Sequence, residues 1–176
     1  SFCVHRGEEP ALSGSRGSGT IFFGNCNMRC VYCQNYQISQ DYDNQRSRET
    51  DYRTLAGHML YLQDEMKCHN INLVSPTHMV PQILRALLEA IPRGLRLPLV
   101  YNSSGYDSLA SLQLLEDVVD IYLPDAKYAA DEAAHTYSQG VNYVAANRAA
   151  LKEMWRQVGE LELDEEGLAR RGLIIR

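Results

Sequence analysis

The chain has 176 residues, of which 45% are hydrophobic and 22% are charged, an ordinary composition for a globular domain with its own core. Its formal net charge is −5, and its basic residues are scattered, so the sequence shows no nucleic-acid footprint. No run approaches the roughly 20 apolar residues of a membrane span. We therefore expect a cytoplasmic protein without a nucleic-acid or membrane partner, in which five cysteines indicate metal or redox chemistry rather than disulfides.

Short apolar runs along the chain predict the strands of an α/β domain. Four of them are "GTIFF" (19–23), "NINLV" (70–74), "LPLVY" (97–101) and "VVDIYL" (118–123). A fifth strand is expected to start near Leu173. Because these strands read as continuous apolar runs, they favour a parallel sheet that is covered by helices.

Amphipathic patterns between the runs predict the helices. One apolar stripe has the i, i+3, i+4 and i+7 spacing of a single helix face and comprises Val80, Ile83, Leu84, Leu87, Leu88 and Ile91. Shorter stripes run from Leu55 to Met66 and from Leu151 to Val158. Residues 39–51 form the most polar segment and are predicted to be a surface loop. The chain starts and stops within apolar stretches, so we expect a domain that is truncated at both ends.

Three cysteines with CxxxCxxC spacing, Cys26, Cys30 and Cys33, follow the first predicted strand. Their loop can fold around a single centre at the carboxyl end of a strand, where α/β sheets place their sites. Iron–sulfur clusters are usually held by four thiolates, so three would leave one iron open to another ligand. The alternative is a structural zinc site completed by Cys3, Cys68 or a histidine. Zinc sites usually combine Cys-x₂-Cys with a second distant pair, which this sequence lacks, and we expect Cys3 and Cys68 to be buried thiols.

The cysteine motif, with Tyr32 before its last cysteine, resembles the cluster motif of radical S-adenosylmethionine (radical SAM) enzymes. More narrowly, "GSGTIFFGNCNMRCVYCQNY" followed by "VSPTH", "YNSSGY" and "DIYLPDAKY" looks like the pyruvate formate-lyase activating enzyme-related radical SAM proteins. This resemblance covers most of the chain. It implies that Cys26, Cys30 and Cys33 bind a four-iron, four-sulfur (4Fe-4S) cluster, and that S-adenosylmethionine (SAM) occupies the fourth iron. The implied activity is reductive cleavage of SAM to a 5′-deoxyadenosyl radical, which abstracts a hydrogen atom.

The resemblance also implies a fold. Radical SAM cores resemble an open version of the (β/α) barrel, and a full eight-stranded barrel needs about 250 residues. We therefore expect a partial (β/α) barrel of the radical SAM type. Residues 1–176 would form an incomplete core domain with about four βα units and the start of a fifth strand.

Further residues match the family motifs that surround the cofactor. Where many members have Gly-Gly-Glu after the second strand, this chain has Ser75, Thr77 and His78, which offer oxygens and a nitrogen but no carboxylate. The matches at the third and fourth strand ends are Asn102, Ser103, Asp125 and Lys127. The resemblance thus implies a cofactor site made of Tyr32, Ser75, Thr77, His78, Asn102, Ser103, Asp125 and Lys127.

Three of these positions have further interpretations. Related enzymes place a monovalent cation near the aspartate that matches Asp125, and Asn102 stands where such a site would have an aspartate. Asp125 and Lys127 could instead form a plain salt bridge at a helix start. The segment "HRGEEP" (5–10) reads as a solvated turn.

Three functions remain open at this point. The chain could activate a glycyl-radical protein, act as a radical SAM enzyme on a small molecule, or be a non-catalytic metal-binding domain of the same fold. The partners implied by the first two are SAM and an electron donor such as flavodoxin or ferredoxin, and the first adds a glycyl-radical protein substrate. The residue that contacts the substrate cannot be identified from the motifs.

Overall fold

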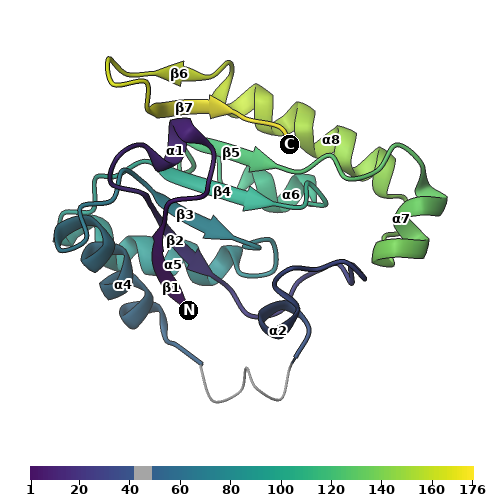
Figure 1. Ribbon diagram of the computed structural model, residues 1–176, viewed down its shortest axis with the longest axis horizontal. Helices are drawn as coiled ribbons and strands as arrows, with labels where there is room; N and C mark the ends of the chain where they lie inside the picture. The colour runs from purple at the N-terminus through teal and green to yellow at the C-terminus, as the bar shows by residue number, and fades with distance from the viewer. Residues whose placement is uncertain (42–48) are drawn as a thin grey trace.

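The computed structural model describes residues 1–41 and 49–176, so most of the polar loop predicted over residues 39–51 lies outside the described residues. Within these two ranges the protein is a mixed α/β fold with one seven-stranded sheet in the order β1-β2-β3-β4-β5-β7-β6 (Figure 1). The strands are β1 (Phe2–His5), β2 (Ser18–Phe22), β3 (Ile71–Val74), β4 (Leu99–Ser103), β5 (Ile121–Pro124), β6 (Glu162–Leu163) and β7 (Ala169–Leu173). β1 and β6 are antiparallel to their neighbours, and the five strands between them are parallel.

The expected α/β class with a mostly parallel sheet is therefore confirmed. The four predicted apolar runs correspond to β2, β3, β4 and β5. The fifth strand, β7, ends at Leu173 instead of starting there. Its sequence "ARRGL" contains two arginines, so it does not read as an apolar run.

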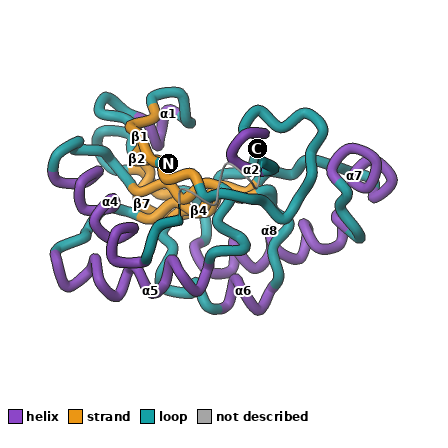
Figure 2. The backbone as a smooth tube through the Cα atoms, turned by 90° about the horizontal axis from the view of Figure 1, so that it is seen from below, coloured by secondary structure: helices purple, strands orange, loops and turns teal. Residues whose placement is uncertain are grey.

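Four helices cover one face of the sheet, and the short helix α1 (Pro10–Ser13) lies on the opposite face (Figure 2). The four are α4 (Tyr52–Asp64), α5 (Val80–Ala90), α6 (Leu109–Gln113) and α8 (Tyr143–Val158). The helix predicted from the first stripe is confirmed by α5, which the 3₁₀ turn η2 (Ile91–Arg93) continues, but Leu88 and Ile91 of that stripe are exposed. Helix α4 ends before Met66, and α8 begins eight residues before Leu151. The remaining helices in the described part of the chain are α2 (Tyr36–Ser39) and α7 (Asp131–Ser138).

The alternation of side chains along each strand divides the core into two layers. Leu73 and Tyr101 point to the face under the four helices, where they join two clusters of buried side chains. Val100 and Ile121 point to the other face and pack against Leu12 of α1. Because α1 is short, it covers only part of this second face, which we call the inner face (Figure 2).

Local signals fix the helix boundaries. Asp51 begins α4 by accepting a hydrogen bond from the backbone N–H of Thr54 at 2.7 Å, and Ser108 caps α6 in the same way through Ser111. Gly159, with φ of 73°, ends α8 in a conformation that favours glycine. Among the described residues, no helix is both long and apolar enough to cross a membrane.

Candidate functional site

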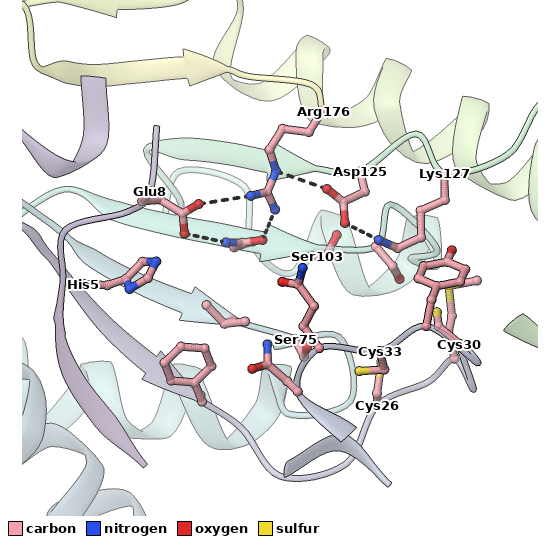
Figure 3. A pocket seen from close by; sticks show the side chains of 18 of the residues that line it. His5, Glu8, Cys26, Cys30, Cys33, Ser75, Ser103, Asp125, Lys127 and Arg176 are labelled. Carbon is pink, nitrogen blue, oxygen red and sulfur yellow. Dashed lines mark hydrogen bonds and ion pairs between the residues drawn. The ribbon is translucent and has the colours of Figure 1, made fainter. Parts of the chain in front are cut away.

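A cavity of about 630 Å³ lies at the carboxyl ends of the parallel strands, on the inner face (Figure 3). Its size lies within the roughly 300–1,000 Å³ range of small-molecule and cofactor sites. Most of the predicted site residues line it together, namely Cys26, Cys30, Tyr32, Cys33, Ser75, Asn102, Ser103, Asp125 and Lys127. They lie at or just after the carboxyl ends of four neighbouring strands, so the parallel sheet itself brings these distant segments to one edge.

The cysteines lie on an irregular loop between β2 and α2, which we call the cysteine loop (24–35). Asn25 has φ of 70°, in the left-handed region that asparagine tolerates better than most residues. Two backbone hydrogen bonds join the loop to the end of α7, from Arg29 N–H to the Ser138 carbonyl (3.0 Å) and from Val31 N–H to the Tyr137 carbonyl (2.9 Å). The loop is therefore held by a helix more than one hundred residues further along the chain.

Each thiol group has its own polar neighbour. Ser138 Oγ donates a hydrogen bond to Cys30 Sγ at 2.9 Å, and Ser39 Oγ lies 3.2 Å from Cys33 Sγ. Burial raises the pKa of the Cys26 thiol, and the charges of Cys30 and Cys33 raise it further. The Cys26 thiol thus lies close enough to Cys30 and Cys33 to be affected by their charges.

No group of three His, Cys, Asp or Glu side chains in residues 1–41 and 49–176 is arranged to hold a metal ion. The two other cysteines lie elsewhere. Cys3 is on β1 opposite Thr20, and Cys68 is buried among the apolar side chains beneath α4. The expectation of a buried thiol is confirmed for Cys68 and wrong for Cys3, which is exposed because β1 is an edge strand.

Polar groups at the strand ends form the wall of the cavity next to the cysteines. Ser75, directly after β3, has φ of 55°, and its N–H donates to the Asn102 carbonyl at 2.9 Å. Ser104 Oγ is buried and has no hydrogen-bond partner among the described residues. Because buried hydroxyls are usually paired, an unpaired one that lines a cavity indicates room for a polar ligand.

A network of charged side chains closes the opposite wall (Figure 3). Arg176 Nη1 pairs with Glu8 Oε1 at 3.0 Å, and Arg176 Nη2 donates to Asn102 Oδ1 at 2.8 Å. Arg176 Nε lies 3.1 Å from Asp125 Oδ1, while Lys127 Nζ pairs with the other oxygen of Asp125. The salt bridge between Asp125 and Lys127 is therefore present, and it lies inside the cavity lining. Both carboxylate oxygens of Asp125 face cations of the protein itself.

Glu8 and Arg176 were missed by the sequence reasoning. The expectation of a solvated turn is wrong for Glu8, whose side chain is only 9% exposed and also accepts hydrogen bonds from Asn72 and Asn102. A carboxylate followed by Glu-Pro carries no local signal of burial. Arg176 extends β7 alongside β5, since its N–H donates to the Pro124 carbonyl and its carbonyl accepts from Ala126 N–H. An arginine that follows a fifth parallel strand could have been assigned to the same edge.

Thr77 and His78 do not line the cavity. Thr77 Oγ1 donates to Asp107 Oδ1 at 2.7 Å, within a buried group of hydroxyls around that carboxylate. His78 Nε2 lies 2.7 Å from the Gly24 carbonyl oxygen. Both residues therefore contact neighbours of the cavity, and His78 supports the start of the cysteine loop.

No protein-family model matches the chain. Over 152 residues the chain is 34% identical to the uncharacterized protein MJ0674 of Methanocaldococcus jannaschii, and the match covers 80% of this chain and 41% of that protein. The chain thus spans less than half the length of this curated relative. The relative's description names no activity.

Proposed function

We propose that the chain is the core of a radical SAM iron–sulfur enzyme in which Cys26, Cys30 and Cys33 would hold a 4Fe-4S cluster. The observation that supports this most is that three thiols on one loop line a cavity whose other walls are polar strand ends. When bound, the cluster and SAM would supply reductive cleavage of the sulfonium to a 5′-deoxyadenosyl radical for hydrogen abstraction. A cytoplasmic location and an electron donor such as flavodoxin or ferredoxin belong to the same proposal.

The donor set fits this assignment. Thiolates are the usual ligands of iron–sulfur clusters, and three of them leave a position for an exogenous ligand. In a cluster each thiolate binds a separate iron, so the three sulfurs need not be grouped around a single ion. The zinc alternative needs further ligands close to the cysteine loop, whereas Cys3 lies on β1 and Cys68 lies between α4 and β3. His5 lines the cavity, but within the described residues it forms no metal-holding group with the cysteines.

The polar wall offers contacts for the amino, carboxylate and hydroxyl groups of SAM. Ser75 and Asn102 line the cavity at neighbouring strand ends. Ser103 also lines the cavity, but its hydroxyl donates to Asp107 Oδ2 at 2.6 Å. The Ser104 hydroxyl is buried without a partner among the described residues. An added ligand would give that hydroxyl a partner and remove the free-energy cost of its isolation. In this proposal the chain's own residues bind and orient SAM, which is the protein's usual contribution in cofactor enzymes.

Apolar side chains complete the lining on the cysteine side. Phe22, Met28 and Val74 line the cavity, and Met28 is almost fully buried. Such a lining excludes water, which lowers the local dielectric constant and protects reactive species from solvent. The combination of an apolar base and a polar wall suits a site for radical chemistry.

The test is anaerobic reconstitution with iron and sulfide, followed by electron paramagnetic resonance (EPR) of the reduced protein before and after SAM is added. We expect a four-iron signal that changes with SAM, together with 5′-deoxyadenosine among the products. Bound zinc without a cluster would overturn the proposal. A full cluster that yields no 5′-deoxyadenosine would leave the non-catalytic metal-binding domain. If 5′-deoxyadenosine forms, transfer of the radical to a copurifying protein glycine would separate an activating enzyme from one that acts on a small molecule.

A further inference from the structure

A continuous chain of hydroxyl groups leads from the cavity rim to one of the three sulfurs. Tyr32 Oη lies 2.5 Å from Tyr128 Oη, which lies 2.5 Å from Ser138 Oγ, and Ser138 Oγ donates to Cys30 Sγ at 2.9 Å. Tyr32 is on the cysteine loop, Tyr128 follows β5, and Ser138 is the last residue of α7. We call Tyr32, Tyr128 and Ser138 the hydroxyl chain.

The number of hydrogens available sets the direction of each hydrogen bond in the hydroxyl chain. Each hydroxyl carries a single hydrogen, and a thiolate can only accept. Because Ser138 gives its hydrogen to Cys30, Tyr128 must donate to Ser138, and Tyr32 must then donate to Tyr128. All three O–H groups therefore point towards the sulfur, and each bond polarises the next.

The hydroxyl chain is held rigidly at the sulfur. The side chain of Ser138 is fully buried, and its carbonyl accepts from Arg29 N–H on the cysteine loop at 3.0 Å. The ring of Tyr128 packs edge-on against Tyr143, with 5.4 Å between centroids. The contact with Cys30 is thus fixed by backbone and packing on both sides, unlike a surface hydroxyl that rotates freely.

We infer that Ser138, with Tyr128 and Tyr32 behind it, is a positioning residue that raises the reduction potential of the proposed cluster through Cys30. This inference rests on the proposed function. Hydrogen bonds to the sulfurs of a cluster are among the features that set its potential, because they stabilise the more negative, reduced state. The hydroxyl chain reaches Cys30 alone among the three cysteines, so the effect enters through a single ligand.

The test is an anaerobic redox titration of the reconstituted protein, monitored by EPR, for S138A, Y128F and Y32F. At a fixed solution potential we expect S138A to lower the ratio of reduced to oxidised cluster about tenfold, which is about 59 mV for a one-electron couple. Y128F should lower the ratio of reduced to oxidised cluster by a smaller factor, and Y32F by the smallest. The matched control is Y106F, because Tyr106 packs beside the cysteine loop but its hydroxyl donates to the Val141 carbonyl.

A second readout is specific to the hydrogen bond. After exchange into deuterated water, electron–nuclear double resonance should detect coupled deuterons near the cluster in the unchanged protein and in Y106F. S138A should lose one of these couplings and keep that of the Ser39 hydroxyl, which lies 3.2 Å from Cys33 Sγ. If the unchanged protein binds no cluster, the proposed function and this inference both fail. If all variants bind it with equal potentials and couplings, this inference alone fails. If S138A does not bind the cluster, the potential of Y128F tests the inference instead, since Tyr128 does not touch the sulfur. A potential equal to that of the unchanged protein would then overturn the inference.

Discussion

Arg176 and Glu8 are 168 positions apart in the chain, and their side chains form an ion pair at 3.0 Å over the inner face of the sheet. The same guanidinium group also contacts Asn102 and Asp125. It therefore links the turn after β1 to the ends of β4 and β5 and fixes one wall of the cavity. A planar guanidinium suits this position because it can serve three oxygen acceptors in different directions at once.

Glu8→Gln should reduce the free energy of unfolding by about 1.5 kcal/mol, because it removes the charge from a 9% exposed side chain that accepts hydrogen bonds from Asn72, Asn102 and Arg176. Gln keeps the size of the side chain and one acceptor oxygen, so the loss reports on charge rather than on packing. Urea unfolding measures the change. The control is Glu65→Gln, because Glu65 is exposed and directly follows the last residue of α4. There the free energy of unfolding should change by no more than about 0.5 kcal/mol. Equal effects at both positions would show that the ion pair contributes no stability.

The interior strands of the fold could be predicted from the sequence because burial on both faces gives continuous apolar runs, as in β3 and β4. The edge strands could not. β1 lies at an edge and has only the short apolar run "FCV", whose first two residues are exposed, and both residues of β6 are exposed, so neither has the longer run of a strand that is buried on both faces. The residues of β7 become a strand through pairing with β5, a long-range contact that no local pattern in "ARRGL" indicates.

The candidate site divides in the same way. Cys26, Cys30 and Cys33 are close in sequence, so their spacing alone predicts a shared centre. Other residues of the site are far from their partners in sequence. Glu8 pairs with Arg176, and Ser138 donates to Cys30, because the topology places these distant segments at one edge of the sheet. Side-chain burial at such positions depends on which segments meet there, and the sequence around Glu8 reads as an ordinary polar turn.

Ser75→Gly should be more stable than Ser75→Ala by about 1 kcal/mol, because Ser75 has φ of 55° and only glycine adopts this region without strain. Both variants lack the hydroxyl, so the comparison isolates the backbone. Thermal unfolding of the two variants measures the difference. If the alanine variant were equally stable, the backbone at this strand end would not carry strain.

Asp107→Asn should change how stability depends on pH. Burial raises the pKa of Asp107 above its ordinary 3.8, while the hydrogen bonds from Ser103, Thr77 and Tyr101 offset part of that rise. Since the folded protein holds this proton more tightly than the unfolded chain, the contribution to stability is complete below about pH 3.8 and is lost as pH rises through the folded pKa. The stability of the asparagine variant relative to the unchanged protein should therefore increase as pH rises from about 4.

Urea unfolding over a series of pH values measures this dependence. The titratable side chains that face Asp107 are Tyr101 and Tyr122, and burial raises the pKa of both above the ordinary 10, so neither titrates in this range. Parallel stability curves for the two proteins would mean that Asp107 keeps an ordinary pKa in the folded state.

The cysteine assignment predicts that Cys26→Ala, Cys30→Ala and Cys33→Ala each lose the four-iron EPR signal and the SAM-dependent change after reconstitution. Cys3→Ala should retain both, because Cys3 is exposed on the edge strand β1. Cys68→Ala should also retain both while losing about 1–2 kcal/mol of stability, since its thiol is buried in the core beneath α4. Iron and acid-labile sulfide per chain provide the measurement, with urea unfolding in parallel. If Cys30→Ala kept a stable four-iron cluster and still cleaved SAM, another residue would have to replace it as the third ligand, and the site would need to be assigned again.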